Sequence, residues 1–134
     1  MPPRKRSETE ITKLPEPHFS EAQAREFAEG VRLFNEGRYW HAHEAFEQAW
    51  KVMTNAPEDD AEIVLRGLVQ LAAGLHCLTE RRERCAVQNF QKATGKLQLG
   101  APRFLNLNIN PVLDFLEDFK QHGNLDARLV LSFV

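Results

Sequence analysis

From residue 20 onward, apolar residues recur every three or four positions, and this spacing predicts amphipathic helices. The first predicted helix begins at Ser20, a favoured N-cap residue that forms a capping-box pattern with Gln23. Gly37 predicts its end, because glycine readily adopts the left-handed conformation that closes helices. A second helix is predicted over about 38–54, with one apolar stripe directed at the core: Tyr39, Ala42, Phe46, Ala49 and Met53.

Three further helices are predicted over about 58–78, 84–99 and 111–121. The last of them would begin at Asn110 as N-cap, carry a proline at its first position, and end at Gly123. No segment with the two-residue period of a β-strand appears before the C-terminal residues. The sequence therefore predicts an all-α fold, a helical bundle of about five helices.

The predicted helices divide the chain into three parts. Residues 1–19 contain four of the seven prolines and little that could pack, so they are expected to form a flexible tail. The helical domain is expected over 20–123. Residues 124–134 are a C-terminal extension, and its residues 127–134, which are apolar and partly β-branched, are expected to lie extended along the bundle or across a partner.

The helical part of the chain also contains an internal repeat. Shifting the sequence by 44 residues superposes four pairs of like residues: Gly30 with Gly74, Ala42 with Ala86, Phe46 with Phe90, and Ala49 with Ala93. This repeat predicts two related helical hairpins, in which a small residue of one helix meets an Ala-Phe-Ala ridge of the next. The fifth helix would close the bundle. The spacing within each hairpin is similar to that of tetratricopeptide helix pairs, although the repeat is longer.

The composition is that of an ordinary globular protein, with 43% hydrophobic and 27% charged residues. A formal net charge of −2 argues against a nucleic-acid-binding surface. The most apolar stretch, 64–78, is too short to span a membrane and carries Arg66. Cys77 and Cys85 lack the paired spacing of a zinc site, and both are expected to be reduced thiols. Because no signal peptide is recognisable, the expected location is cytoplasmic.

Polar residues border the core on the second and third predicted helices. The second helix carries His43, Glu44 and Glu47, and the third carries Arg66, Gln70 and His76. If these helices are antiparallel, residues equally far from the connecting turn lie level with each other. Glu47 would then pair with Arg66, and His43 with Gln70, as a hydrogen-bonded structural cluster. Glu44 is expected to point outward, and His76 to lie about 9 Å further along its helix, on another face.

Two functions are compatible with this cluster. In the first, the chain is a binding or interaction module without a cofactor, and Tyr39, Trp40 and Trp50 supply core and a partner surface. Its partner would be another protein or a second copy of the chain. In the second, a divalent metal bound by His43, Glu47 and His76 supports hydrolytic chemistry. The first function is favoured because the metal-binding pattern His-Glu-x-x-His is absent. Whether the chain is an enzyme stays open.

Two stretches of the chain resemble the domain of unknown function 309 family. They are residues 33–47, which are followed by Trp50, and residues 66–76. The resemblance extends over roughly 27–120 and implies a compact all-helical domain with no established activity. The chain departs from the family pattern at His41, where an acidic residue is expected, at 80–83, which replace an Arg-Gly-Asn turn, and at Cys85, where glycine is expected.

Overall fold

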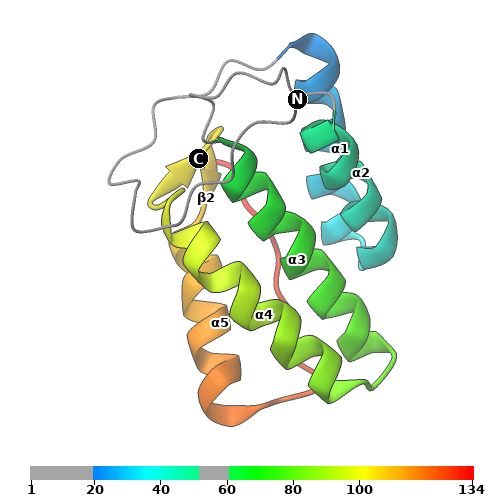
Figure 1. The fold of residues 1–134 in the computed structure, drawn as a ribbon, viewed down its shortest axis with the longest axis vertical. Coiled ribbons are helices and arrows are strands. Elements are labelled where there is room, and N and C mark those ends of the chain that lie inside the picture. The colour runs from blue at the N-terminus through cyan, green and yellow to red at the C-terminus, as the bar shows by residue number, and fades with distance from the viewer. Residues whose placement is uncertain (1–19, 52–60) are drawn as a thin grey trace, which may run out of the picture.

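The structure is a computed structural model that describes residues 20–51 and 61–134. Its described part contains five helices and one pair of short strands, so the predicted all-α bundle is confirmed (Figure 1). In chain order the elements are α1 (Glu21–Asn35), α2 (Tyr39–Lys51), α3 (Ala61–Thr79), α4 (Glu83–Gln98), β1 (Arg103–Phe104), β2 (Leu107–Asn108) and α5 (Asn110–His122). The predicted tail over 1–19 and the predicted ends of the second and third helices near 52–60 lie outside the described residues.

Local signals account for several helix ends. The Ser20 hydroxyl accepts a hydrogen bond from the Gln23 backbone N–H at 3.1 Å, and the Gln23 side chain accepts one from the Ser20 N–H. This is the predicted capping box, and it satisfies two N–H groups that a helix start otherwise leaves free. Gly37, two residues after the end of α1, has φ of +81°, and Gly123 is left-handed directly after α5. Both glycines therefore end helices where the sequence predicts.

The core lies between successive helices, each of which packs against the next along the chain. Each glycine at the repeat positions accommodates a phenylalanine ring from the following helix. A Cβ on Gly30 would lie 2.5 Å from Cε1 of Phe46, and a Cβ on Gly74 would lie 2.5 Å from Cε1 of Phe90. The largest fully buried side chains include Phe34, Phe46, Ile63, Leu65, Leu68, Leu71, Leu75 and Leu97.

Helix α3 runs through the middle of the bundle (Figure 1). It is the one described helix that is long and apolar enough to cross a membrane by length and composition, over Glu62–Thr79. Of that window, 67% is buried inside the bundle. Its apolar character is thus what a core helix requires.

A short antiparallel hairpin follows α4, which the sequence does not predict. Strands β1 and β2 pair Arg103 with Asn108 and Phe104 with Leu107. The two residues between the strands, at 105 and 106, have φ of +51° and +64°, as a tight two-residue hairpin turn requires. Four paired residues are too few for an alternating pattern to stand out in the sequence.

The C-terminal residues return along the bundle to this hairpin (Figure 1). Phe133 forms an isolated bridge with Leu107, and the Val134 N–H donates to the Asn106 carbonyl at 2.7 Å. Leu131 is buried and exchanges two hydrogen bonds with the Asn35 side chain at the end of α1. Of the two arrangements expected for 124–134, the extension along the bundle is the one observed.

Two expectations about single residues are wrong. Asn110 is not the N-cap of α5 but its first residue, because the helix begins one position earlier, after Ile109. Cys77 and Cys85 are not free thiols: their sulfurs are bonded at 2.14 Å. The tight turn between α3 and α4 brings their Cα atoms to 5.8 Å, a separation at which a disulfide can form.

Candidate functional site

The predicted polar cluster lies on α2 and α3. On α2, His43 Nε2 is 3.5 Å from Glu47 Oε2, one helical turn away. These side chains are 17% and 30% exposed, so the pair lies at the border of the core. Glu44 points outward as predicted: its side chain is 61% exposed and lies 3.7 Å from Nδ1 of His41.

Trp40 connects the cluster to His76, which sequence reasoning had placed apart from it. The Trp40 ring stacks on the His43 ring, with centroids 4.6 Å apart and planes 17° apart. The same ring lies 5.2 Å from the His76 ring of α3. Trp40 is 48% exposed, so it forms surface rather than core, whereas Tyr39 is buried as predicted. The side chain of Trp50 lies outside the described residues.

The two predicted cross-helix pairs do not form. Within 20–51 and 61–134, no ion pair joins Glu47 to Arg66 and no hydrogen bond joins His43 to Gln70. Instead, His43 Nδ1 and Gln70 Oε1 are both buried without a hydrogen-bond partner. Equal distance from a turn sets the level of two residues along their helices but not their rotation about the helix axes. Glu47 consequently faces His43 on its own helix.

The geometry gives no support to the metal-site alternative. Among the described residues, no group of three His, Cys, Asp or Glu side chains is arranged to hold a metal ion. His43 and His76 face the same indole ring, and each has a carboxylate four residues along the chain near its Nε2: Glu47 for His43, and Glu80, in the turn after α3, at 3.8 Å for His76. The cluster is thus two histidine–carboxylate pairs joined by one tryptophan.

Two residues of α1, Glu29 and Arg32, have perturbed pKa values. A hydrogen bond from Arg32 lowers the pKa of Glu29, and pairing with Glu29 and Glu36 raises that of Arg32. Arg32 is 53% exposed in these ion pairs. An exposed network of this kind is typical of a solvated helix face.

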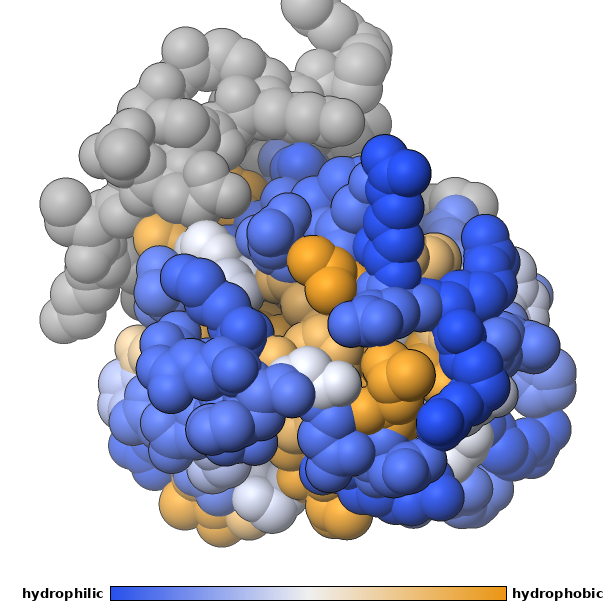
Figure 2. All heavy atoms as spheres, turned by 90° about the horizontal axis from the view of Figure 1, so that it is seen from below, coloured by the Kyte–Doolittle hydropathy of each residue, from blue (hydrophilic) through white to orange (hydrophobic). Residues whose placement is uncertain are grey.

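A second feature, an open groove of about 740 Å³, lies between α4 and α5. Apolar side chains from both helices line it: Val87, Phe90, Leu113, Leu116 and Phe119. The Phe90 and Phe119 rings meet edge to face, with centroids 4.9 Å apart. Seen from the lower end of the bundle, apolar surface opens between hydrophilic side chains (Figure 2).

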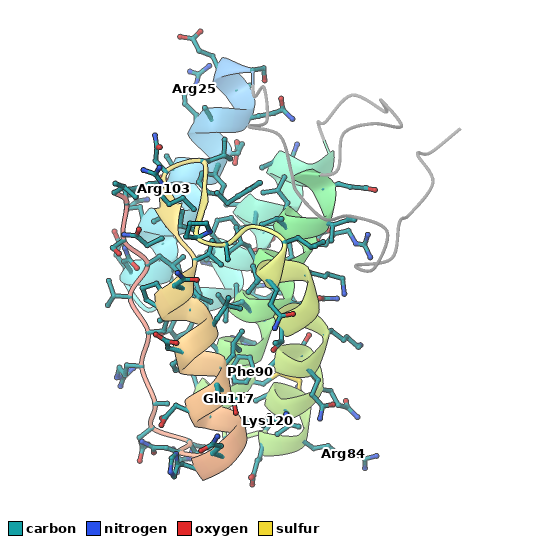
Figure 3. The ribbon with its side chains drawn as sticks, turned by 90° about the vertical axis from the view of Figure 1, so that its left-hand side faces the viewer. Arg25, Arg84, Phe90, Arg103, Glu117 and Lys120 are labelled. Atoms are coloured by element: carbon teal, nitrogen blue, oxygen red, sulfur yellow. A yellow bond between two sulfur atoms is a disulfide. The ribbon has the colours of Figure 1, made fainter. Side chains whose placement is uncertain are left out.

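The rim of this groove is mostly acidic. Glu83, Asp114 and Glu117 are exposed there, with Lys120 as the one ammonium group among the lining residues. Phe90 of α4 and Glu117 and Lys120 of α5 lie in the region between the two helices (Figure 3). The groove thus combines an apolar floor with excess negative charge at its edges, a pattern typical of a binding surface.

Residues 27–89 match the model of the family Domain of unknown function (DUF309). Over these residues, slightly less than half of the chain, the sequence is similar to that family. The chain matches no curated protein.

The matched segment contains the whole polar cluster but only two of the residues that line the groove, Glu83 and Val87. It runs from α1 through α2 and α3 into α4, and it ends directly before Phe90. All of α5 lies outside it. The groove is therefore not described by the DUF309 match, which also names no activity for the cluster.

Sequence reasoning missed the groove, although α5 carries a signal for it. Three side chains of α5 are buried and form the apolar stripe by which the helix packs on the core: Val112, Leu116 and Phe119. Leu113 and Phe115 add apolar surface beside that stripe and are only partly buried. An apolar face wider than one packing contact indicates that a helix has a second surface to cover.

Proposed function

We propose that this chain is a binding module whose α4–α5 groove takes an amphipathic helix with basic flanks, presented by a protein partner. The observation that carries this proposal is the open apolar groove with its acidic rim. A groove between two helices is the site where an amphipathic third helix buries its apolar face. The proposal makes no use of a metal or of hydrolytic chemistry.

The floor of the groove favours a helical occupant. Val87, Phe90 and Thr94 follow one another on α4 at spacings of three and four, and Leu113, Leu116 and Lys120 do so on α5. Two such rows form a channel along the helices, into which apolar side chains at positions i, i+3/i+4 and i+7 of a third helix can insert. Phe90 and Phe119 give the channel an aromatic base, and aromatic residues often contribute most to binding energy.

The rim favours a basic occupant. Three carboxylates and one ammonium group surround the opening, so lysine or arginine residues beside the apolar face of the partner would find opposite charge. Complementary charge of this kind mainly raises the association rate and selects among partners. The groove would accordingly discriminate against an acidic helix of the same hydrophobicity.

The other features have supporting roles in this proposal. The His43–Glu47 pair, together with Trp40 and His76, is a structural element of α2 and α3. The two hairpins form a repeat, supported by the like contacts of Gly30 and Gly74, and this repeat supplies a rigid frame for the groove. A cytoplasmic location is part of the proposal and can be tested by cell fractionation.

The proposal is tested by calorimetric titration of the full chain with a designed helical peptide. The peptide has leucines at i, i+3, i+4 and i+7 and lysines at the flanking positions. We expect it to bind the wild-type chain at least tenfold more tightly than the same peptide with glutamate in place of lysine. This preference should weaken as salt is added, since exposed charges are screened. Equal binding of the two peptides contradicts a basic partner.

Two matched variants locate the binding surface. Val87→Gln changes the groove floor, and Val69→Gln changes a partly buried valine outside the groove lining. We expect Val87→Gln to lower the affinity by about tenfold, as for a residue that contributes to the buried centre of an interface. Val69→Gln should leave the affinity unchanged. An equal loss of affinity for the peptide in both variants contradicts the proposal. So does a groove that binds only a second copy of the chain or only a small apolar molecule.

A further inference from the structure

The disulfide between Cys77 and Cys85 joins two helices at one end of the bundle. Cys77 lies in the last turns of α3, and Cys85 is the third residue of α4. The Cys77 side chain is buried, with 4% of its surface exposed, whereas Cys85 is partly exposed. Of the two cysteines, Cys85 is therefore the one that a thiol in solution reaches more readily.

A pocket of about 370 Å³ lies beside Cys85. It is lined by Arg82, Glu83, Arg84 and Gln88 in addition to the cysteine. Two arginines and one glutamate thus line the pocket beside Cys85. Cys85 also lies in the first turn of α4, where backbone N–H groups point outward and favour negative charge. Such surroundings stabilise a thiolate and attract a thiol that carries carboxylates.

We propose that Cys85 is a thiol–disulfide exchange site for a small anionic thiol of the glutathione class, with Cys77 as its resolving partner. The thiolate of the small molecule attacks Cys85 Sγ, a new sulfur–sulfur bond forms there, and Cys77 Sγ leaves as a thiolate that takes up a proton. A second small thiol then attacks the mixed disulfide. This second attack yields the reduced Cys85 and the disulfide of the small thiol. Over both steps the protein gains two electrons and two protons.

Asn89 is placed to assist this exchange as a positioning residue. Its Nδ2 donates to the Cys85 carbonyl at 3.0 Å and lies 3.9 Å from Cys77 Sγ and 3.7 Å from Cys85 Sγ. An amide N–H at this distance can donate to either sulfur when that sulfur carries negative charge. The proposal is independent of the α4–α5 groove, because no helical partner takes part in the exchange.

The exchange is tested by incubating the full-length chain in buffers of reduced and oxidised glutathione. Free thiols are trapped by alkylation, and the intact mass distinguishes dithiol, internal disulfide and glutathione adduct. We expect the wild-type chain to pass reversibly between the first two forms. The Cys77→Ser variant should retain glutathione on Cys85. In the Cys85→Ser variant, glutathione should attach to Cys77 at least tenfold more slowly than it attaches to Cys85 in the first variant, because Cys77 is buried. Absence of the internal disulfide in oxidised glutathione, or equal rates at the two cysteines, overturns the proposal.

The role of the arginines has a matched control. Arg84 lies at the lower end of the bundle and Arg103 at the upper end (Figure 3). Arg84→Gln should slow reduction of the disulfide by glutathione roughly threefold or more, while reduction by uncharged mercaptoethanol stays the same. Arg103→Gln makes the same charge change away from the pocket and should alter neither rate. An equal effect of both variants on glutathione overturns the assignment of the pocket as its binding site.

Discussion

The Phe46 ring occupies the space that a side chain at Gly30 would need. A Cβ built on Gly30 would lie 2.5 Å from Cε1 and 2.6 Å from Cδ1 of this ring. Real Cβ atoms do not approach ring carbons this closely, and Phe46 is fully buried, so the ring cannot simply turn away. Helices α1 and α2 can therefore pack at this separation only while residue 30 lacks a side chain.

We predict that Gly30→Ala lowers the free energy of unfolding by about 1–3 kcal/mol, as overpacking of a core does. Phe46→Ala should cost about 3–5 kcal/mol, because a large buried ring is lost. In a double-mutant cycle, Gly30→Ala should cost less when Phe46→Leu is also present, since leucine leaves room for the new methyl group. Urea titration measures Phe46→Ala and the four chains of the cycle, and strict additivity within the cycle would show that the two residues do not compete for space.

The same experiment at Gly74 and Phe90 tests the repeat. Gly74 faces Phe90 at the distance at which Gly30 faces Phe46. If the two hairpins are built alike, Gly74→Ala and Phe90→Ala should cost about as much as their counterparts, within about 1 kcal/mol. Losses below about 1 kcal/mol at both positions of the second hairpin would count against an equivalent role.

A second prediction concerns the attachment of the C-terminal residues to α1. Asn35 Nδ2 donates to the Leu131 carbonyl at 2.8 Å, and the Leu131 N–H donates to Asn35 Oδ1 at 2.7 Å. Asn35→Ala removes both bonds and leaves two backbone groups of a buried residue unpaired, so it should cost about 1–3 kcal/mol. Hydrogen exchange at the Leu131 amide should accelerate in parallel.

Asn108 provides a matched comparison for Asn35. Its side chain donates to the Ser132 hydroxyl at 3.3 Å in an exposed position. Asn108→Ala should therefore cost less than Asn35→Ala, because water can replace an exposed hydrogen bond. If Asn108→Ala proves the more destabilising, the paired bonds of Asn35 are not what holds the C-terminal residues in place.

A third prediction follows from the lowered pKa of Glu29. The hydrogen bond from Arg32 lowers this pKa below its ordinary value of 4.5 in the folded chain. Unfolding therefore makes the carboxylate easier to protonate, and the pair contributes stability above the unfolded pKa. That contribution disappears as the pH falls through the lower, folded pKa. Glu29→Gln should thus reduce stability slightly at neutral pH and have no effect at strongly acidic pH.

The control for Glu29 is the double variant with Arg32. If the effect comes from this pair, Glu29→Gln should add less to a chain that already carries Arg32→Gln than it does to the wild type. Thermal unfolding over the acidic range measures both chains. A loss of stability by Glu29→Gln that persists unchanged below the folded pKa would point to another cause, such as the helix propensity of the new residue.

The helices could be predicted from the sequence because their signals are local. Ser20 with Gln23, and Gly37, each act within one turn of chain, so no knowledge of the partner helices is needed. The disulfide could not be predicted in this way. Cys77 and Cys85 are eight positions apart, and only the turn between α3 and α4 decides that their Cα atoms come to 5.8 Å.

The candidate site was only partly predictable for the same reason. Helical spacing placed His43 and Glu47 on one side of α2, and they do lie together. The expected contact with Arg66 depends on how α2 and α3 are rotated about their axes, which residue spacing does not determine. The groove depends on how far α5 stands from α4, and that separation is a property of the whole bundle.

A last prediction separates a buried amide that has partners from one that has none. Gln70 Oε1 is buried on α3 without a hydrogen-bond partner, so the folded chain carries the cost of removing it from water. Gln70→Met removes this oxygen and keeps a long flexible side chain that can fill the same space. We expect the free energy of unfolding to stay the same or to rise by about 1 kcal/mol, because the loss of an unpaired group costs nothing.

Gln23→Met is the matched control, since Gln23 is also buried but its oxygen accepts the Ser20 N–H at 2.9 Å. The same substitution there breaks the capping box and should cost about 1 kcal/mol. Urea titration of the two variants should therefore give effects of opposite sign, or a clear loss at Gln23 alone. A loss at Gln70 as large as that at Gln23 would mean that the amide has a partner in solution after all. The predicted bond with His43 would then be the first candidate for it.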